Sequence, residues 1–328
     1  MVIGHNIQYG SDSSLRLTGE FFEHPLFKFI YSFHMPLFAL ISGYLCHIRD
    51  NESVFGFLMR KVRVFFVPIL SWVCVEFFIK TIIGLQDLSS LKLFITSFFS
   101  QLVYSYWFLW AMLLSSIAIW IFEKYFNCNM WIAIVAIIFS MVIPNKLNSN
   151  LYVYVFPYFL LGYMWKKRSK EGNLSLKQSN AALVAVTLVF GILLTSYNYN
   201  SYIYMTQIYL FGTLGWKNQI ITNLFRWVIG LVGSIFVVLL CYRIENKLHR
   251  YVKGFLMYLG KNTLGIYIVS NIFNVYLYKV FYKVIENTYL QNEIIWGIET
   301  VIVLILCIAI CHVLKKSKVL CTLLLGGR

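Results

Sequence analysis

The sequence predicts an all-α fold: a polytopic bundle of transmembrane helices with about ten spans, the first of them partial. Two observations lead to this prediction. Hydrophobic residues make up 59% of the chain and charged residues 12%, with a mean hydropathy of +0.71, whereas soluble domains carry about 25% charged residues. The apolar residues also form long runs, and a chain in lipid must satisfy its backbone hydrogen bonds within each helix. A soluble globule and a disordered chain are excluded.

Apolar stretches close to the roughly 20 residues that cross a bilayer predict nine spans. They lie at about 27–48, 63–83, 103–123, 129–145, 151–165, 180–198, 219–242, 263–283 and 293–314. The apolar residues 1–8 precede a polar loop and are expected to be the last turns of a further span whose beginning is absent. Two shorter apolar stretches, 91–102 and 200–214, are expected to be interfacial or re-entrant segments.

Lys and Arg are distributed unevenly between alternate loops. Eighteen lie on one side of the predicted topology, and the other side holds four, Arg16, Lys92, Lys146 and Lys217. Because cytoplasmic loops keep the excess of positive charge, we expect a multi-pass protein of the inner (cytoplasmic) membrane with both termini, including the tail 315–328, in the cytoplasm. This bias and contact with anionic lipid headgroups explain the net charge of +15, so no nucleic-acid partner is expected.

The seven cysteines are odd in number and scattered, and they form neither CxxC pairs nor Cys/His clusters with zinc-ligand spacing. No disulfide framework and no metal site are therefore expected.

Charged groups inside spans are costly, so each is a candidate functional residue. Glu76 and Lys80 are four residues apart on one predicted helix, where they either neutralise each other or serve a function. Arg226 and Glu299 lie in the outer thirds of their spans. They either pair with one another or line a polar cavity, and the sequence leaves both alternatives open.

His34 stands two residues before Pro36 in an apolar span. A proline inside a helix frees a backbone carbonyl, which is tolerated in a membrane only where the opening is buried in protein or lines a cavity. His34 is therefore either a catalytic residue in a water-accessible place or a core histidine bonded to a neighbouring carbonyl.

Five sequence blocks share one order along the chain: FHMPLF at 33–38 followed by Ser42-Gly43, RKVR at 60–63 leading to Pro68, YWFLW at 106–110, FPYFLLGY at 156–163, and LGKNTLGIY at 259–267. In these blocks the chain resembles the acyltransferase-3 family of integral membrane O-acyltransferases. More narrowly, it is similar to the fucose 4-O-acetylase-like branch of that family. The first block is the most specific of the five.

The resemblance implies a single acyltransferase-3-like membrane domain over residues 1–328, in which residues 27–314 hold the spans after the first. It implies acetyl-CoA as the co-substrate, used from the cytoplasm, no metal, and a carbohydrate hydroxyl as the acceptor. The family's first span ends in a catalytic histidine, which Gly4-His5 matches. The family arginine about ten residues upstream has no counterpart here, and Ser270 stands where relatives commonly have a further histidine.

Acyl transfer from a thioester requires removal of the hydroxyl proton, which suits an imidazole. With the resemblance, His5 is expected to be the general base or acyl relay. His34 is expected to orient it, to contact the acceptor or to act as the base itself, so the two imidazoles are expected to meet in a water-filled pocket. Direct transfer and an acyl-histidine intermediate both remain open.

Arg60 and Arg63 are expected to lie on one helix face and to hold the phosphates of coenzyme A. The alternative is that they only anchor the cytoplasmic side. The expected acceptor-binding residues are Trp107, Trp110, Arg226 and Glu299. For the two tryptophans, the alternative is an aromatic belt at the membrane interface.

These observations predict an integral membrane O-acetyltransferase that moves an acetyl group from acetyl-CoA to a cell-surface polysaccharide or a lipid-linked sugar. A polysaccharide exporter, flippase or polymerase would share the many spans and basic loops. Such transporters are expected to show inverted repeats or paired broken helices, which the sequence lacks. A degenerate family member that binds without catalysing is the third alternative. The sequence does not indicate the oligomeric state.

Overall fold

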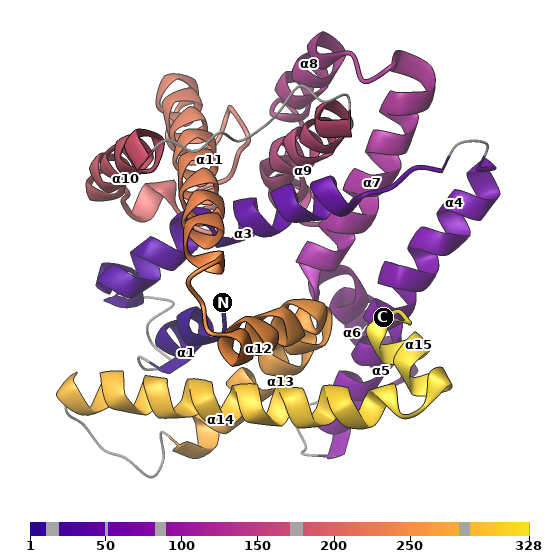
Figure 1. Cartoon of the computed structure of the whole chain (residues 1–328). Helices are drawn as coiled ribbons and strands as arrows, with labels where there is room; N and C mark the ends of the chain where they lie inside the picture. The colour runs from indigo at the N-terminus through magenta and orange to yellow at the C-terminus, as the bar shows by residue number, and fades with distance from the viewer. Residues whose placement is uncertain (11–19, 50–51, 83–89, 171–179, 282–288, 328) are drawn as a thin grey trace. The chain divides into compact units, whose positions relative to one another are not determined.

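The computed structural model describes residues 1–10, 20–49, 52–82, 90–170, 180–281 and 289–327. The described residues form helices and contain no strand (Figure 1). The predicted all-α fold class is therefore confirmed.

The helices follow one another as α1 (Val2–Gly10), η1 (Glu20–Glu23), α3 (Pro25–Leu45), α4 (Val54–Lys61), η2 (Val62–Phe66), α5 (Val67–Ile82), α6 (Leu91–Tyr104), α7 (Trp107–Phe126), α8 (Met130–Ser140), α9 (Ser149–Lys170), α10 (Asn180–Thr195), η3 (Tyr199–Ser201), α11 (Trp216–Glu245), α12 (Arg250–Lys261), α13 (Thr263–Phe281), α14 (Tyr289–Lys315) and α15 (Lys318–Leu325). The turns η1 and η3 are 3-10 helices, and η2 is a π-helix.

Each of the nine predicted spans coincides with a helix, although the lengths differ. Among the described residues, five helices are long and apolar enough to cross a membrane: Pro25–Leu45, Val54–Ile82, Trp107–Phe126, Trp216–Glu245 and Trp296–Lys315. The expected span at 129–145 contains α8, which has only 11 residues. The stretch 91–102 forms α6, whereas most of 200–214 is irregular. A total of about ten spans stays a prediction.

The helical contacts divide the chain into two compact units, which are described separately. The first unit comprises Met1–Ile30, Arg63–Tyr106 and Leu248–Arg328. In it, α1, α13 and α14 pack against one another, and α15 packs against α5 and α14 (Figure 1). The indole nitrogen of Trp72 on α5 donates a hydrogen bond of 2.8 Å to the carbonyl oxygen of Leu324, which holds the C-terminal helix in place.

The second unit comprises Tyr31–Val62 and Trp107–Lys247, in which α7 packs against α9 and α10 against α11. Gly43 of α3 and Gly162 of α9 form a reciprocal close contact. A methyl group at Gly43 would overlap the carbonyl oxygen of Phe159, and one at Gly162 would overlap that of Leu40. The two backbones can therefore touch, which is how small residues allow helices to associate in membranes.

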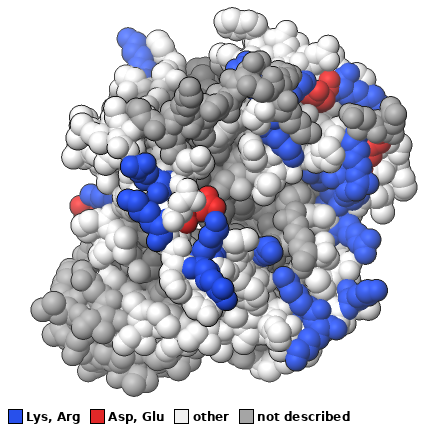
Figure 2. Space-filling model, in the orientation of Figure 1, with Lys and Arg blue, Asp and Glu red and all other residues white. Residues whose placement is uncertain are grey.

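Basic side chains predominate over acidic ones on the surface. On the face shown in Figure 2, Lys and Arg are far more numerous than Asp and Glu. One conspicuous basic element is α12, an amphipathic helix without a buried residue, which carries Arg250, Lys253 and Lys261. This pattern is typical of helices that lie at a membrane surface.

Candidate active site

The predicted site residues fall into both units. His5, Arg63 and Glu299 belong to the first unit, and the second unit holds His34, Arg60, Trp107, Trp110 and Arg226. The expected meeting of His5 with His34 joins residues of different units, so it stays a prediction.

In the first unit, α1 places His5 half-buried beside α13 and α14. The side chain of His5 is hydrogen-bonded to Gln8, one turn further along α1. Asn6, the next residue, donates from Nδ2 to the hydroxyl of Thr300 on α14 at 2.9 Å. Glu299, directly before Thr300, is 5% exposed. The helices carrying His5 and Glu299 are thus joined by a hydrogen bond between the residues next to them.

In the second unit, α3 buries His34 to 6% exposure. Its ring meets that of Tyr31 edge to face, with 4.5 Å between the centroids. Pro36 follows within the same helix and packs near Gly230 of α11, where a methyl group would come within 2.7 Å of its Cγ. His34 is therefore oriented by an aromatic neighbour on a helix that is tightly packed around its proline.

Arg226 holds an irregular segment against α11. Its side chain is 1% exposed, and Nε donates to the carbonyl oxygen of Ser201 at 2.8 Å. Nη1 donates to Asn223 Oδ1 at 3.0 Å and to the Gln207 carbonyl at 3.4 Å. Nη2 donates to the carbonyls of Asn200 at 2.6 Å and Thr206 at 2.9 Å, and it also contacts the Thr206 hydroxyl.

A guanidinium has five N–H donors, and these contacts use all of them. Non-helical backbone is tolerated at membrane depth only where protein or a cavity satisfies it. Arg226 therefore stabilises residues 200–207, which the sequence predicted to be interfacial or re-entrant. The surroundings of Arg226 are polar and consist of four backbone carbonyls, the Thr206 hydroxyl and the Asn223 side-chain oxygen.

The segment held by Arg226 carries two tyrosines toward other predicted site residues. Tyr202 is 5.6 Å from Tyr31, which contacts His34, and Tyr204 is 6.1 Å from Trp107, measured between ring centroids. Trp107 opens α7, and Trp110 lies half-buried one turn further along the same helix. His34, Trp107 and Arg226 are therefore brought into one neighbourhood through residues 200–207.

Arg60 lies in the last turn of α4 and is paired with Glu52. Its Nε and Nη2 donate to the two carboxylate oxygens at 2.9 and 2.6 Å, and Nη2 also reaches the carbonyl of His47 at 3.1 Å. This hydrogen bonding lowers the pKa of Glu52 below its ordinary value. Arg63 lies exposed in the π-helical turn η2, beyond the end of α4. Binding of coenzyme A phosphates by the two arginines stays a prediction.

Cysteine chemistry is not indicated at either half of the site. The seven cysteines all lie in the described ranges, and none of them is part of a disulfide. Between α7 and α8, burial and then the neighbouring Glu123 carboxylate raise the pKa of the Cys128 thiol to about 12. A thiol protonated at neutral pH is a poor nucleophile. Within the described ranges, no three His, Cys, Asp or Glu residues are grouped in a way that could hold a metal ion.

Several residues of this arrangement were missed by the sequence reasoning. Asn6 and Thr300 are uncharged, so a search for ionisable groups in spans passes over them. Tyr31 and Tyr202 are ordinary aromatic residues in apolar stretches. The buried arginine was the one signal for the ordered segment, because an unpaired charge in a span requires partners.

Several helices are long and apolar enough to span a membrane, and they carry buried polar and titratable groups, which is the pattern of a multi-pass membrane protein. Residues 1–315 match the acyltransferase domain family (Acyl_transf_3). The chain belongs to this family. The resemblance noted in the sequence is thereby confirmed.

Two curated relatives cover about half of the chain. Nodulation protein NolL of Sinorhizobium fredii is 32% identical over 174 residues, which are 52% of this chain and 46% of the relative. Nodulation protein NolL of Mesorhizobium japonicum is 30% identical over 168 residues, 50% of this chain and 44% of the relative. The matched part thus spans less than half of either relative. No solved structure matches the chain.

Proposed function

We propose that this membrane acyltransferase transfers an acetyl group from acetyl-CoA to a hydroxyl of a cell-surface polysaccharide or a lipid-linked sugar. The observation that carries the proposal is the family match over residues 1–315, and within that range we take His5 and His34 as the proposed catalytic residues. The location that fits is the inner membrane with both termini in the cytoplasm, because the basic loops then face the cytosolic donor.

The proposed reaction needs one proton acceptor and one site for the developing negative charge. The acceptor hydroxyl gives its proton to an imidazole and attacks the carbonyl carbon of the thioester. The C–S bond of the tetrahedral intermediate then breaks, and the coenzyme A sulfur leaves with the proton that the imidazole held. A well-placed general base contributes about 10²–10⁴-fold to such a step.

The assignment of roles to the two histidines follows from their settings. His5 belongs to α1, which is fixed to α14 beside Glu299. His34 is fixed by Tyr31 on a helix that also carries Pro36. We assign the base or acyl-relay role to His5, and to His34 the orientation of His5 or of the acceptor hydroxyl. Trp107 and Trp110 are assigned to sugar stacking, and Glu299 and the segment held by Arg226 to the surroundings of the acceptor.

The donor is proposed to bind on the cytoplasmic side, where Arg60 and Arg63 supply charge for the phosphates of coenzyme A. Arg60 already makes a bidentate pair with Glu52, so a phosphate would have to compete with that carboxylate or add to the remaining donors. Arg63 is exposed on the surface. We therefore expect Arg63→Ala to raise the KM for acetyl-CoA more than that for 3′-dephospho-acetyl-CoA.

The test compares a gene deletion with complementation by the full-length protein. Deletion is expected to remove O-acetyl signals from a surface or secreted glycan in NMR and mass spectra. Wild type and His249→Ala are expected to restore them, because His249 is exposed on the loop before α12. His5→Ala and His34→Ala are expected to leave acetylation about 10²-fold or more below wild type. Unchanged acetylation after deletion would contradict the proposed function.

A further inference from the structure

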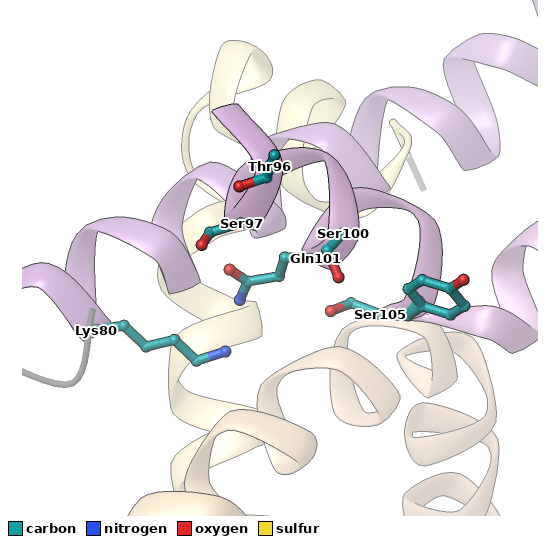
Figure 3. A pocket seen from close by; sticks show the side chains of 7 residues that line it. Lys80, Thr96, Ser97, Ser100, Gln101 and Ser105 are labelled. Carbon is teal, nitrogen blue, oxygen red and sulfur yellow. The ribbon is translucent and has the colours of Figure 1, made fainter. Parts of the chain in front are cut away.

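Outside the residues assigned above, α5 and α6 border an open hollow on the surface of the first unit (Figure 3). Its volume is about 560 Å³, within the range of small-molecule sites. Its lining is polar apart from one aromatic ring, and it comprises Lys80, Thr96, Ser97, Ser100, Gln101, Tyr104 and Ser105. None of these residues has a role in the proposed reaction.

The hollow exists because α6 has two different faces. Phe94 and Phe98 pack edge to face on Phe77 of α5, with ring centroids 5.1 and 5.7 Å apart. Helical periodicity places the hydroxyl and amide residues 96, 97, 100 and 101 together on another face. Figure 3 shows the side-chain ends of Lys80 and Gln101 pointing into the same space from the two helices. The aromatic contact thus holds a polar helix face beside a lysine.

The positive charge of Lys80 in the hollow is neutralised by Glu76, and contacts with buried residues fix the position of that carboxylate. Lys80 Nζ lies 3.0 Å from Glu76 Oε1, and the Tyr106 hydroxyl donates to Glu76 Oε2 at 3.1 Å. Glu76 and Tyr106 are both buried. Tyr106 adopts a left-handed backbone with φ +52°, which is uncommon for a residue other than glycine. Such conformations persist where the surroundings fix them, and they cluster at ligand-binding sites.

Gln101 supplies a second, independent sign of a ligand. Its Nε2 is buried and has no hydrogen-bond partner among the residues that the structure describes. A buried donor without an acceptor is costly, and such groups are rare in native proteins. A ligand oxygen that reached this nitrogen would satisfy it.

The lining identifies the chemistry of that ligand. Hydroxyl and carboxamide groups both donate and accept hydrogen bonds, which matches a molecule that carries several hydroxyls. Because Glu76 compensates Lys80, the site has no net charge with which to attract a phosphate or carboxylate. Tyr104 adds an exposed aromatic ring at the edge. This is the composition expected for a neutral sugar ring.

We propose that the hollow between α5 and α6 is a sugar-binding subsite for the carbohydrate acceptor, with Gln101 and the serines of α6 as hydrogen-bonding residues. This inference rests on the proposed function, because it names the part of the chain that holds the glycan. By the distribution of Lys and Arg, these residues face away from the cytoplasm. An acceptor at the cell surface can reach them there.

The test measures sugar binding directly. The full-length protein in lipid nanodiscs is mixed with the methyl glycosides of fucose, galactose, glucose and N-acetylglucosamine, and saturation transfer from protein to sugar protons is recorded by NMR. Wild type is expected to give a signal with at least one glycoside. Gln101→Leu is expected to reduce that signal about tenfold or more, since it leaves an apolar group where the donor was.

The controls separate loss of the subsite from loss of the fold. Thr187→Val removes a hydroxyl from the exposed surface of α10 and is expected to leave the signal unchanged. If Gln101→Leu does not elute as a single species, the double variant Ser97→Ala, Ser100→Ala replaces it. No signal from wild type with any glycoside, or a full signal from the subsite variants, overturns the inference. Displacement of the sugar by millimolar inorganic phosphate overturns the neutral-ligand assignment.

Acyl transfer in the same nanodiscs distinguishes this inference from the proposed function. If wild type acetylates a glycan and the subsite variants keep its KM for the acceptor, the inference fails and the function stands. If wild type binds sugar through Gln101 but transfers no acetyl group to any glycan, the function fails and the sugar subsite stands. A raised acceptor KM with unchanged turnover in the subsite variants supports both.

Discussion

The amide nitrogen of Asn6 donates to the hydroxyl of Thr300 across 2.9 Å, although 294 residues separate the two in sequence. The bond fastens the first helix of the chain to α14. Asn6 is 1% exposed and immediately follows His5, and Thr300 immediately follows Glu299. One hydrogen bond between uncharged side chains therefore fixes the position of His5 on α1 relative to Glu299 on α14.

A double-mutant cycle tests this bond. Asn6→Ala and Thr300→Val each remove one partner, and we expect a coupling energy of about 0.6 kcal/mol, the average for side-chain hydrogen bonds between membrane helices. Each single variant is expected to lower the acetylation rate, because α1 also carries His5. The measurement is unfolding in detergent for the four members of the cycle. Additive effects, as expected for Asn6→Ala combined with Thr187→Val of the second unit, would show that the bond does not contribute.

The reciprocal contact of Gly43 and Gly162 makes a second prediction. Gly43→Ala places a methyl group against the Phe159 carbonyl, so α3 and α9 must move apart, and overpacking of this kind costs about 1–3 kcal/mol. Gly191→Ala is the matched control, because no other atom lies within 4 Å of a methyl group there. The control is expected to stabilise α10 by about 0.5–1 kcal/mol. Equal thermal midpoints for the two variants would contradict the close approach.

The fold class followed from the sequence because burial in lipid acts on every residue of a span. Long apolar runs predict helices without knowledge of their partners, and all nine predicted spans contain a helix. The same local reasoning gave an ion pair of Glu76 and Lys80 as one of two alternatives, and the structure has this pair at 3.0 Å. Partners four residues apart on one helix are fixed by the helix itself.

Contacts between distant segments could not be predicted in this way. No local pattern in the sequence pairs Asn6 with Thr300. A buried charge at Arg226 requires hydrogen-bond partners, but the sequence does not show which residues these are. Four of its six hydrogen-bond acceptors are backbone carbonyls of the segment 200–207, which carry no side-chain signature. The type of a residue predicts which kind of interaction it needs. Which acceptor a given donor finds depends on how the irregular backbone packs against it.

The pair of Glu52 and Arg60 predicts a pH dependence of stability. The hydrogen bond from Arg60 lowers the pKa of Glu52 in the folded protein, whereas the unfolded chain has the ordinary pKa near 4.5. The stabilisation is therefore fully present above that ordinary pKa and is lost as the pH falls through the folded pKa.

Thermal unfolding of wild type and Glu52→Gln checks this dependence. We expect wild type to be the more stable at about pH 7, and the difference to shrink as the pH falls through the lowered pKa of Glu52, below which both proteins carry a neutral residue at this position. Glu245→Gln, in an exposed place at the end of α11, is the matched control. A difference that stays constant over this range would mean that the carboxylate charge contributes nothing.

The hydrogen-bond acceptors around Arg226 predict that lysine cannot replace this arginine. A lysine side chain at this position would present one nitrogen, whereas the carbonyls of Asn200, Ser201 and Thr206 are met by two different nitrogens of the guanidinium fork. Arg226→Lys should leave several of these buried carbonyls without a donor, at about 1–3 kcal/mol for each group. The segment between η3 and α11 is then expected to open while the helices remain folded.

Limited chymotrypsin digestion measures that opening, because the segment contains Tyr202, Tyr204, Tyr209 and Phe211. We expect Arg226→Lys to be cleaved there about tenfold faster than wild type, since even about 1.4 kcal/mol raises an open population tenfold. The control is Arg243→Lys, the same change of side chain at an exposed position in the last turn of α11. We expect this variant to be cleaved at the rate of wild type. Acetylation should fall in parallel with cleavage, because the opened segment withdraws Tyr202 from Tyr31 and so loosens the neighbour that orients His34. Fast cleavage with full acetylation would place the segment outside the reaction, and slow cleavage would show that the guanidinium fork is not what holds it.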